Sequence, residues 1–379
     1  MPGLLLGPGN PRSVKRRPHR VLNKKVLSWI GSFCEIENTR AGKVSSNRIN
    51  KNMSELCLDF VTVDVFSTAT FGGNPLAVFF AVPHLTDQQM QQIAAEMNYS
   101  ETTFVLPPAD QANTANIRIF TPVAELPFAG HPNVGTGYVL AGNPSAVPAE
   151  GVVTSQVYDS SGRQHQKMRF EERAGLVEVV VEMLGQALPG RASISPPQNF
   201  QHRPGHSVVA MANALGLRTD QIVARDLGSD IVSVGMEFPV VEVVDLGALE
   251  ACRANPSAFA QLSLYPDDLS AASSGLDEAF LVYVYCRTEQ RVVRARMFDP
   301  LHGIPEDPAT GSAAGALVGL LASRDQVQGS ARYEVLQGHE IRRPSRITVD
   351  LLRDNGQVLE THISGDCVEV IRGRFTCPQ

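Results

Sequence analysis

A five-residue pattern that occurs twice constrains the fold of this chain more than any other feature of its 379 residues. Arg-x-Phe-x-Pro appears as RIFTP at 118–122 and again as RMFDP at 296–300, 178 residues later. Each copy is followed by a turn rich in proline or glycine and then by a stretch of small residues that suits a helix. A repeat of this kind indicates a duplicated half. We therefore predict two similar lobes, whose equivalent helices begin at one cleft between the lobes.

The hydrophobic pattern predicts an α+β fold and not a doubly wound parallel sheet, because strand-like runs outnumber helices and do not alternate with them. Thr86 and Gln89 form a capping-box pattern that predicts a helix ending near Asn98. A second helix is expected at 204–217. We expect strands at 60–66, 76–81, 102–106, 115–120, 152–158, 167–171, 176–183, 238–243, 279–286, 292–298, 346–352, 357–363 and 366–371.

Charge divides the chain into a basic leader and an acidic body. Residues 1–52 hold 11 Lys and Arg against 2 acids, a net charge of +9, and the other 327 residues hold 22 against 37, a net of −15. The leader has three interpretations: a targeting segment, a disordered tail, or a dispensable extension before a natural start at Met53. We therefore expect a leader at 1–53, a first lobe at 54–188 and a second lobe at 189–379. The last strand or two are expected to return to the first lobe.

Composition excludes several classes of function. The net charge of −6 argues against nucleic acid as the main partner. No run approaches the roughly 20 apolar residues of a membrane-spanning helix. The six cysteines form no CxxC pair, which favours a reducing, cytoplasmic compartment. The sequence also lacks a P-loop, a GxGxxG fingerprint, a GxSxG elbow and zinc-ligand spacing.

The two loop–helix segments hold the residues best suited to bind an anion. Free N–H groups at the start of a helix, together with its dipole, favour negative charge. His131 stands at the expected N-cap of the first helix, with Pro132 in its first turn. The segment Asp307–Ser312 opens the second helix, and the alternative there is a tightly packed structural helix capped by Thr310 or Ser312. A lone histidine is more often structural than functional.

Glu101 stands where an expected helix ends and a strand begins. A carboxyl group at such a corner can serve as a general acid or base if burial raises its pKa. The alternative is a solvated turn residue.

Several segments together resemble the phenazine-biosynthesis F-like (PhzF-like) proteins. The resemblance covers about residues 56–373, and its motifs occur in the family's order. They read VDVFSTATFGGNPLAVFF, MNYSETTFVLPP, IRIFTPVAELPFAGHPNVGTGYVL and FDPLHGIPEDPATGSAAGALVGLLA, followed by LQGHEIRRPSRITV and HISGDCVEVI. The resemblance implies a diaminopimelate-epimerase-like fold, in which each of two lobes wraps a curved sheet around a central helix.

The resemblance also implies an activity and a set of site residues. The family archetype is an isomerase without metal or organic cofactor, which shifts a proton across a dihydro-hydroxyanthranilate ring. Glu101 of the SET motif would be the acid/base. Gly130 and His131 of the first loop, with Asp307, Gly311 and Ser312 of the second, would bind the substrate. The implied partner is a small carboxylated metabolite, with no nucleic acid and no membrane, and the protein would be a cytoplasmic homodimer.

Two alternatives remain: an epimerase or racemase of an amino-acid derivative, and a non-catalytic member that binds a metabolite. Related epimerases and racemases use one cysteine on each loop, whereas His131 and Ala309 stand in this region here and no cysteine falls on either loop. A single-carboxylate isomerase is therefore the leading hypothesis. Arg342 departs from the family pattern, because many relatives have glycine before the RPS sequence.

Overall fold

The structure is a computed structural model that describes residues 55–80, 82, 85–153, 155–159, 161–185, 188–225, 228–262 and 280–378. The leader expected at 1–53 lies outside these residues. Both lobes belong to one unit, Met53–Gln379. In the described part of the chain, no helix combines the length and apolar character needed to cross a membrane.

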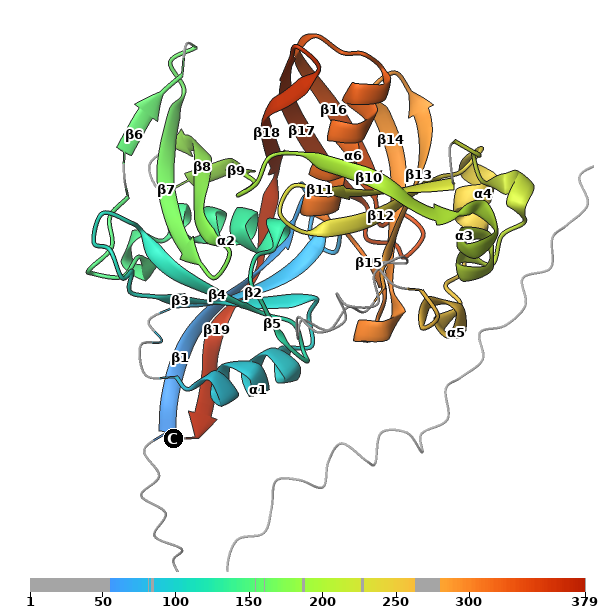
Figure 1. The fold of residues 1–379 in the computed structure, drawn as a ribbon. Helices are drawn as coiled ribbons and strands as arrows, with labels where there is room; N and C mark the ends of the chain where they lie inside the picture. Colours follow the sequence, from blue (N-terminus) through green and yellow to red (C-terminus); the bar gives the residue numbers. More distant parts are fainter. Residues whose placement is uncertain are drawn as a thin grey trace, which may run out of the picture. The chain divides into compact units, whose positions relative to one another are not determined.

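The first lobe is a curved sheet packed around helix α2 (Gly130–Gly142) (Figure 1). In order of pairing, the sheet consists of β19 (Cys367–Pro378), β1 (Glu55–Val65), β2 (Asn74–Phe80), β3 (Glu101–Leu106), β4 (Ala115–Phe120), β7 (Gln164–Glu172), β8 (Gly175–Gly185) and β9 (Leu188–Ser195). The short strands β5 (Glu125–Leu126) and β6 (Ser155–Tyr158) pair with β4 and β7. Helix α1 (Asp87–Met97) connects β2 to β3, and its Thr86–Gln89 capping box is present as predicted.

The second lobe is built in the same way around helix α6 (Gly311–Arg324). Its sheet consists of β10 (Gln201–Ser207), β11 (Gly228–Ser233), β12 (Glu237–Glu242), β13 (Val282–Glu289), β14 (Val292–Asp299), β16 (Gly329–Gln337), β17 (Ser345–Asp354) and β18 (Gln357–Gly365). Strand β15 (Ile304–Asp307) pairs with β14. The smaller helices are α3 (Val208–Leu215), α4 (Leu246–Ala251) and α5 (Pro256–Phe259), with 3-10 turns at Pro144–Ala146, Thr219–Gln221 and Pro300–His302.

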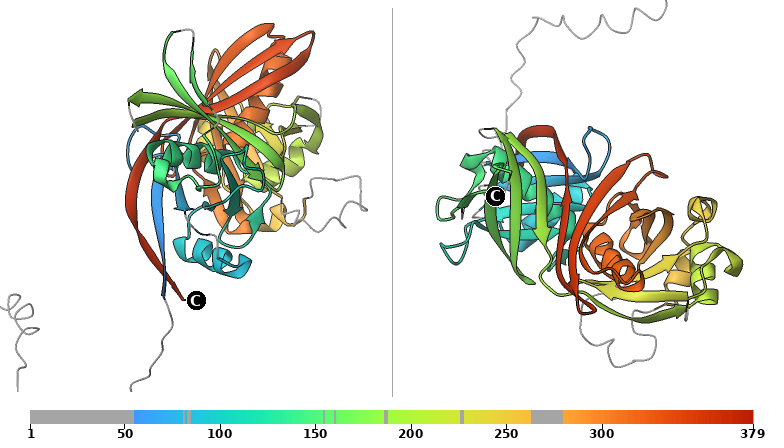
Figure 2. Two further views of the ribbon diagram at one scale, coloured as in Figure 1. Left: turned by 90° about the vertical axis from the view of Figure 1, so that its left-hand side faces the viewer. Right: turned by 90° about the horizontal axis from the view of Figure 1, so that it is seen from above.

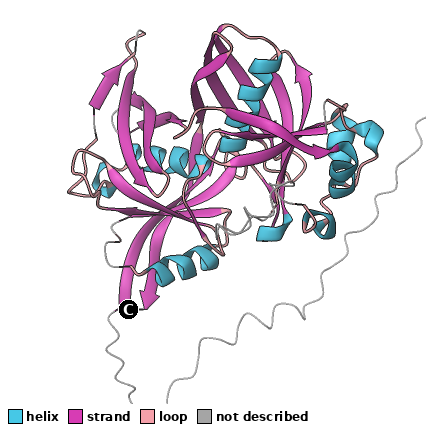
Figure 3. Cartoon of the chain, in the orientation of Figure 1, coloured by secondary structure: helices cyan, strands magenta, loops and turns pink. Residues whose placement is uncertain are grey.

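The order of strand directions demonstrates the duplication. Along each sheet the successive pairings are antiparallel, antiparallel, parallel, antiparallel, parallel, antiparallel and antiparallel. The chain's last strand, β19, lies beside β1 and fills the place that β10 fills in the second lobe (Figure 2). β9 is the last strand of the first sheet and β18 the last strand of the second, and the two pair with each other at Ile194 and Ile363. Strands dominate the described chain, as the sequence predicted (Figure 3).

The helix expected at 204–217 is wrong in its first four residues, 204–207. Residues Gln201–Ser207 form β10, and the helix α3 begins only at Val208. Pro204 lies in β10, which pairs only with β11 among the described strands. Proline is tolerated in such an edge strand, because its missing N–H removes no hydrogen bond to a second neighbouring strand. Ser207 then caps the helix by accepting from the backbone N–H of Ala210.

Helices α2 and α6 are buried on all sides, which requires small residues along them. A Cβ atom on Gly137 would lie 2.4 Å from Cγ1 of Val179 on β8. A Cβ atom on Gly315 would lie 2.7 Å from Cδ1 of Ile363 on β18. Glycine at these positions therefore lets each sheet approach its helix closely.

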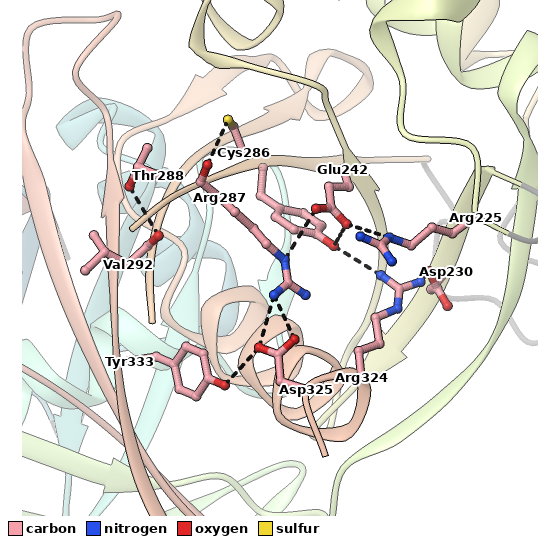
Figure 4. A network of polar contacts seen from close by, with 11 residues as sticks. Arg225, Asp230, Glu242, Cys286, Arg287, Thr288, Val292, Arg324, Asp325 and Tyr333 are labelled. Atoms are coloured by element: carbon pink, nitrogen blue, oxygen red, sulfur yellow. Dashed lines mark hydrogen bonds and ion pairs between the residues drawn. The ribbon is translucent and has the colours of Figure 1, made fainter. Parts of the chain in front are cut away.

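A network of charged groups surrounds the C-terminal end of α6 (Figure 4). Arg324, the last residue of α6, donates to Asp230 at 2.6 Å and to the Tyr285 hydroxyl at 3.1 Å. The same hydroxyl donates to Glu242 at 3.0 Å, and Glu242 also accepts from Nε of Arg225 at 3.1 Å. Because Glu242 is buried and Arg324 belongs to α6, this network fixes the far end of the helix whose other end begins at Gly311.

We predict that Glu242→Ala lowers the free energy of unfolding by about 1–3 kcal/mol, because it leaves the buried Tyr285 hydroxyl without its acceptor and removes the anion that the partly exposed Arg225 and Arg287 bind. Urea unfolding of the full chain measures this loss. Glu334→Ala is the control, since its ion pair with Arg346 is largely solvated, and it should cost at most about 1 kcal/mol. Equal losses in the two variants would contradict the assigned role of the network.

Candidate active site

Glu101 and His131 meet where β3 and α2 begin. Oε2 of Glu101 lies 3.3 Å from Nε2 of His131. Only 4% of the His131 side chain and 14% of the Glu101 side chain are exposed. The two atoms are not aligned as a hydrogen bond, and neither has another partner among the described residues. A buried donor and a buried acceptor are thus left for a ligand.

Asn74, the first residue of β2, links both lobes at this point. Its Nδ2 donates to Oδ1 of Asp307 at 2.8 Å and to the Ala309 carbonyl at 3.0 Å. The same Nδ2 lies 3.3 Å from Nδ1 of His131. An amide nitrogen only donates, so we assign Nδ1 as the acceptor and place the imidazole proton on Nε2, which faces Glu101.

Asp307 is held by three donors from two lobes. Besides the bond from Asn74, Oδ1 accepts from Oγ of Ser100 at 3.3 Å, and Oδ2 accepts from Oγ1 of Thr310 at 2.6 Å. Gln337 at the end of β16 supports this loop, because its Nε2 donates to the Asp307 carbonyl and its Oε1 accepts from the Thr310 N–H. The Asp307 carboxyl group is therefore fixed in place and is already satisfied by hydrogen bonds.

The N-termini of α2 and α6 are in contact beside these groups. A Cβ atom on Gly130 would lie 2.9 Å from the backbone nitrogen of Ser312, so only glycine lets the two helix ends approach this closely. Neither N-cap residue, Ala129 for α2 or Thr310 for α6, accepts a first-turn N–H with its side chain. The first-turn amides and the positive ends of both helix dipoles therefore favour an anion at this junction.

Burial sets the protonation states of the site. It raises the pKa of Glu101 well above the ordinary value, and the nearby carboxyl groups of Asp307 and Asp299 raise it further. Burial lowers the pKa of His131 to about 3. It also raises the pKa of Asp307 to about 6, although the bonds from Thr310, Asn74 and Ser100 oppose this shift. Because the imidazole of His131 is uncharged at neutral pH, its close contact with Glu101 is not a salt bridge, and burial favours the protonated form of Glu101.

The structure brings Glu101, Gly130, His131, Asp307, Gly311 and Ser312 together around one junction. One expectation is wrong: His131 is not an N-cap but the second residue of α2, because Ala129 has the extended backbone of the cap. Sequence reasoning also missed Asn74 and Gln337. Asn74 is part of the FGGNP segment, whose pattern signals a turn, and Gln337 carries no local signal at all.

Arg342 occupies an exposed turn, and its φ of 61° lies in the left-handed region that favours glycine. That geometry explains why glycine suits this position. The neighbouring Arg343 connects the lobes instead, by donating to Asp64 at 2.6 Å and to the carbonyls of Gly72 and Gly73.

Comparison with known proteins gives a consistent result. A family model described as phenazine biosynthesis-like protein matches residues 63–373. The trans-2,3-dihydro-3-hydroxyanthranilate isomerase of Pseudomonas chlororaphis is 34% identical over 317 residues, which cover 83% of this chain and 98% of that protein. Among solved structures, a PhzF-family phenazine biosynthesis protein of Bacillus anthracis has a TM-score of 0.67 at 22% identity and covers 86% of this chain and 100% of its own. A hydroxyproline epimerase of Agrobacterium vitis has a TM-score of 0.53 at 13% identity, covering 85% and 93%.

The raised pKa of Glu101 predicts a dependence of stability on pH. Above about pH 4.5 the unfolded chain loses a proton that the native Glu101 retains, so rising pH destabilises the native state until the native pKa is passed. His131 has the opposite effect between about pH 3 and pH 6.5, where it is protonated only in the unfolded chain. In that range a rise in pH stabilises the native state. Because His131 is present in both proteins, its contribution cancels when the free energy of unfolding of Glu101→Gln is compared with that of the wild type.

We therefore predict that Glu101→Gln becomes more stable relative to the wild type as the pH rises from 5 to 8, as measured by urea unfolding. Glu360→Gln, at an exposed position on β18, should follow the wild type at both values of pH. A Glu101→Gln profile parallel to the wild type would show that Glu101 is not held in its protonated form.

Proposed function

Because this chain belongs to the phenazine biosynthesis-like protein family and is an isomerase, we propose that it moves a proton between two carbons of a small carboxylated substrate, with Glu101 as the acid/base. The predicted family and the predicted diaminopimelate-epimerase-like fold are confirmed. The observation that supports the proposed chemistry best is the buried, unpartnered pair of Glu101 Oε2 and His131 Nε2, beside two uncapped helix N-termini.

The proposed reaction needs one carboxyl group and no change in oxidation state. Ionised Glu101 takes a proton as a carbon–hydrogen bond breaks, and the electron pair spreads into the adjacent unsaturated, carboxylated system. Glu101 then returns the proton to another carbon of that system, where a new carbon–hydrogen bond forms. A raised pKa suits a group that must both accept and donate near neutral pH.

The helix junction would stabilise the charge that develops in this step. The first-turn amides at Gly130, His131, Gly311 and Ser312 would hold the substrate carboxylate, and the Nε2–H of His131 would donate to the delocalised anion. Such donors cost no reorganisation during the reaction, because the two buried helices already fix them. The name of the P. chlororaphis relative makes trans-2,3-dihydro-3-hydroxyanthranilate the first substrate to test.

We predict that the wild-type chain moves a proton within this substrate and admits deuterium at carbon when it is incubated in D2O. Glu101→Gln should lower the rate by about 10²–10⁴-fold, because it removes the proton-transfer group and keeps the shape of the side chain. NMR of the substrate measures both the new carbon–hydrogen bond and the deuterium content. The solvated Glu360→Gln is the control and should retain the wild-type rate.

The same experiment separates the alternatives. Exchange confined to one stereocentre, with inversion, would identify an epimerase or racemase and overturn the proposal. A ligand that binds without exchange, equally in wild type and Glu101→Gln, would identify a metabolite-binding protein. The homodimer, the cytoplasmic location and the absence of metal and cofactor stay predictions.

A further inference from the structure

The repeated Arg-x-Phe-x-Pro motif forms the same side-chain arrangement in both lobes, which we call the first and second clamp. In the first, Arg118 on β4 donates to both carboxylate oxygens of Glu125, from Nε at 2.8 Å and from Nη2 at 2.7 Å. Its guanidinium carbon lies 5.2 Å from the ring centre of Phe120. The arginine is thus fixed by a bidentate ion pair on one side and an aromatic ring on the other.

The second clamp repeats each of these contacts. Arg296 on β14 donates to the two oxygens of Glu306 at 2.9 and 2.7 Å, and its guanidinium carbon lies 4.7 Å from the ring centre of Phe298. Two independent ion pairs with the same geometry at equivalent places of a duplicated fold indicate a shared role. Neither ion pair has a part in the proposed proton transfer.

The remaining guanidinium nitrogen of each arginine contacts an outer helix. Nη1 of Arg118 pairs with Asp87, the first residue of α1. Nη1 of Arg296 donates to the carbonyls of Leu249 at 2.9 Å and Cys252 at 3.1 Å, at the C-terminal end of α4, where a cation also suits the dipole. Helices α1 and α4 both follow the third strand of their sheet in the order given above, so each clamp connects equivalent elements.

Both glutamates stand at the same distance from the helix that follows. Glu125 precedes Gly130 by five residues, and Glu306 precedes Gly311 by five, in each case within the sequence Glu-x-Pro-x-x-Gly. Aligning the two copies makes Ser312 the counterpart of His131. Each clamp therefore fixes the chain just before the turn that leads into a site helix, on β5 in one lobe and on β15 in the other.

We propose that Arg118 and Arg296 are positioning residues, which act through Glu125 and Glu306 to place the N-termini of α2 and α6 against each other. Arginine is required because its planar fork binds both carboxylate oxygens and stacks on the ring at once, whereas the lysine ammonium group cannot do both. The effect on catalysis rests on the proposed function, but the effect on the two loops does not.

The burial of the clamps decides which variants are informative. Arg296 and Glu306 are 5% and 8% exposed, so truncating Arg296 would leave a buried carboxylate unpaired and threaten folding. Arg118 and Glu125 are 21% and 14% exposed. We therefore choose Arg118→Lys and Arg296→Lys, which keep the charge and lose the fork. Arg332→Lys is the matched control, because Arg332 on β16 makes an equally bidentate but solvent-exposed pair with Asp350 on β17.

The test is amide hydrogen–deuterium exchange of the full chain, read by mass spectrometry. Arg118→Lys should speed exchange in 126–137 and Arg296→Lys in 307–318, each by roughly tenfold, as expected when a local opening becomes easier. Arg332→Lys should leave both segments unchanged. Unchanged exchange in the clamp variants, or an equal change in the control, would overturn the proposal. This readout needs no substrate, so it stands even if the proposed isomerisation fails.

On a substrate that the wild type isomerises, kcat/KM should fall about 10–100-fold in either clamp variant, as expected for a displacement of the reacting groups by a fraction of an ångström to one ångström. The Glu101-dependent pH profile should keep its shape, because the acid/base itself is intact. Wild-type kinetics in a variant whose loop exchanges faster would refute the positioning role.

Discussion

Two helix N-termini meet at Gly130 and Ser312, so closely that a Cβ atom on Gly130 would lie 2.9 Å from the Ser312 nitrogen. The positive ends of two helix dipoles repel each other unless negative charge lies nearby. The Asp307 carboxyl group is close to this junction, held by Asn74 and Thr310, and neither N-cap residue, Ala129 or Thr310, accepts a first-turn N–H with its side chain. The junction is thus suited to an additional anion, which in the proposed reaction is the carboxylated substrate.

The architecture around the junction follows from the need to bury both helices completely. A helix surrounded by a sheet must be apolar or small on every side, and α2 and α6 meet this requirement with glycines that admit Val179 and Ile363. The sheets are completed by exchange between distant parts of the chain, because β19 joins β1 and β18 joins β9. The β18–β9 pairing connects the two lobes, and Arg343 adds a further link through Asp64.

The Glu101–His131 pair shows how burial changes the protonation behaviour of ordinary residues. Nothing local distinguishes Glu101 from a solvated turn residue or His131 from a structural histidine, and both alternatives stood open on sequence grounds. The fold removes water from both side chains, which raises the pKa of one and lowers that of the other. Asn74 then directs the imidazole proton toward the carboxyl group.

The duplication, the strand-rich fold class and the Thr86 capping box could be predicted from the residues alone, because they depend on periodicity and on contacts only a few residues apart. The sequence also pointed to both loops of the site through their glycines and prolines. The three-dimensional structure was needed to place Ala129 at the cap, to identify 201–207 as a strand, and to bring Asn74 and Gln337 to the candidate site. These roles depend on groups that folding brings together from distant parts of the chain, and the spacing of residues along the sequence does not indicate which groups will meet.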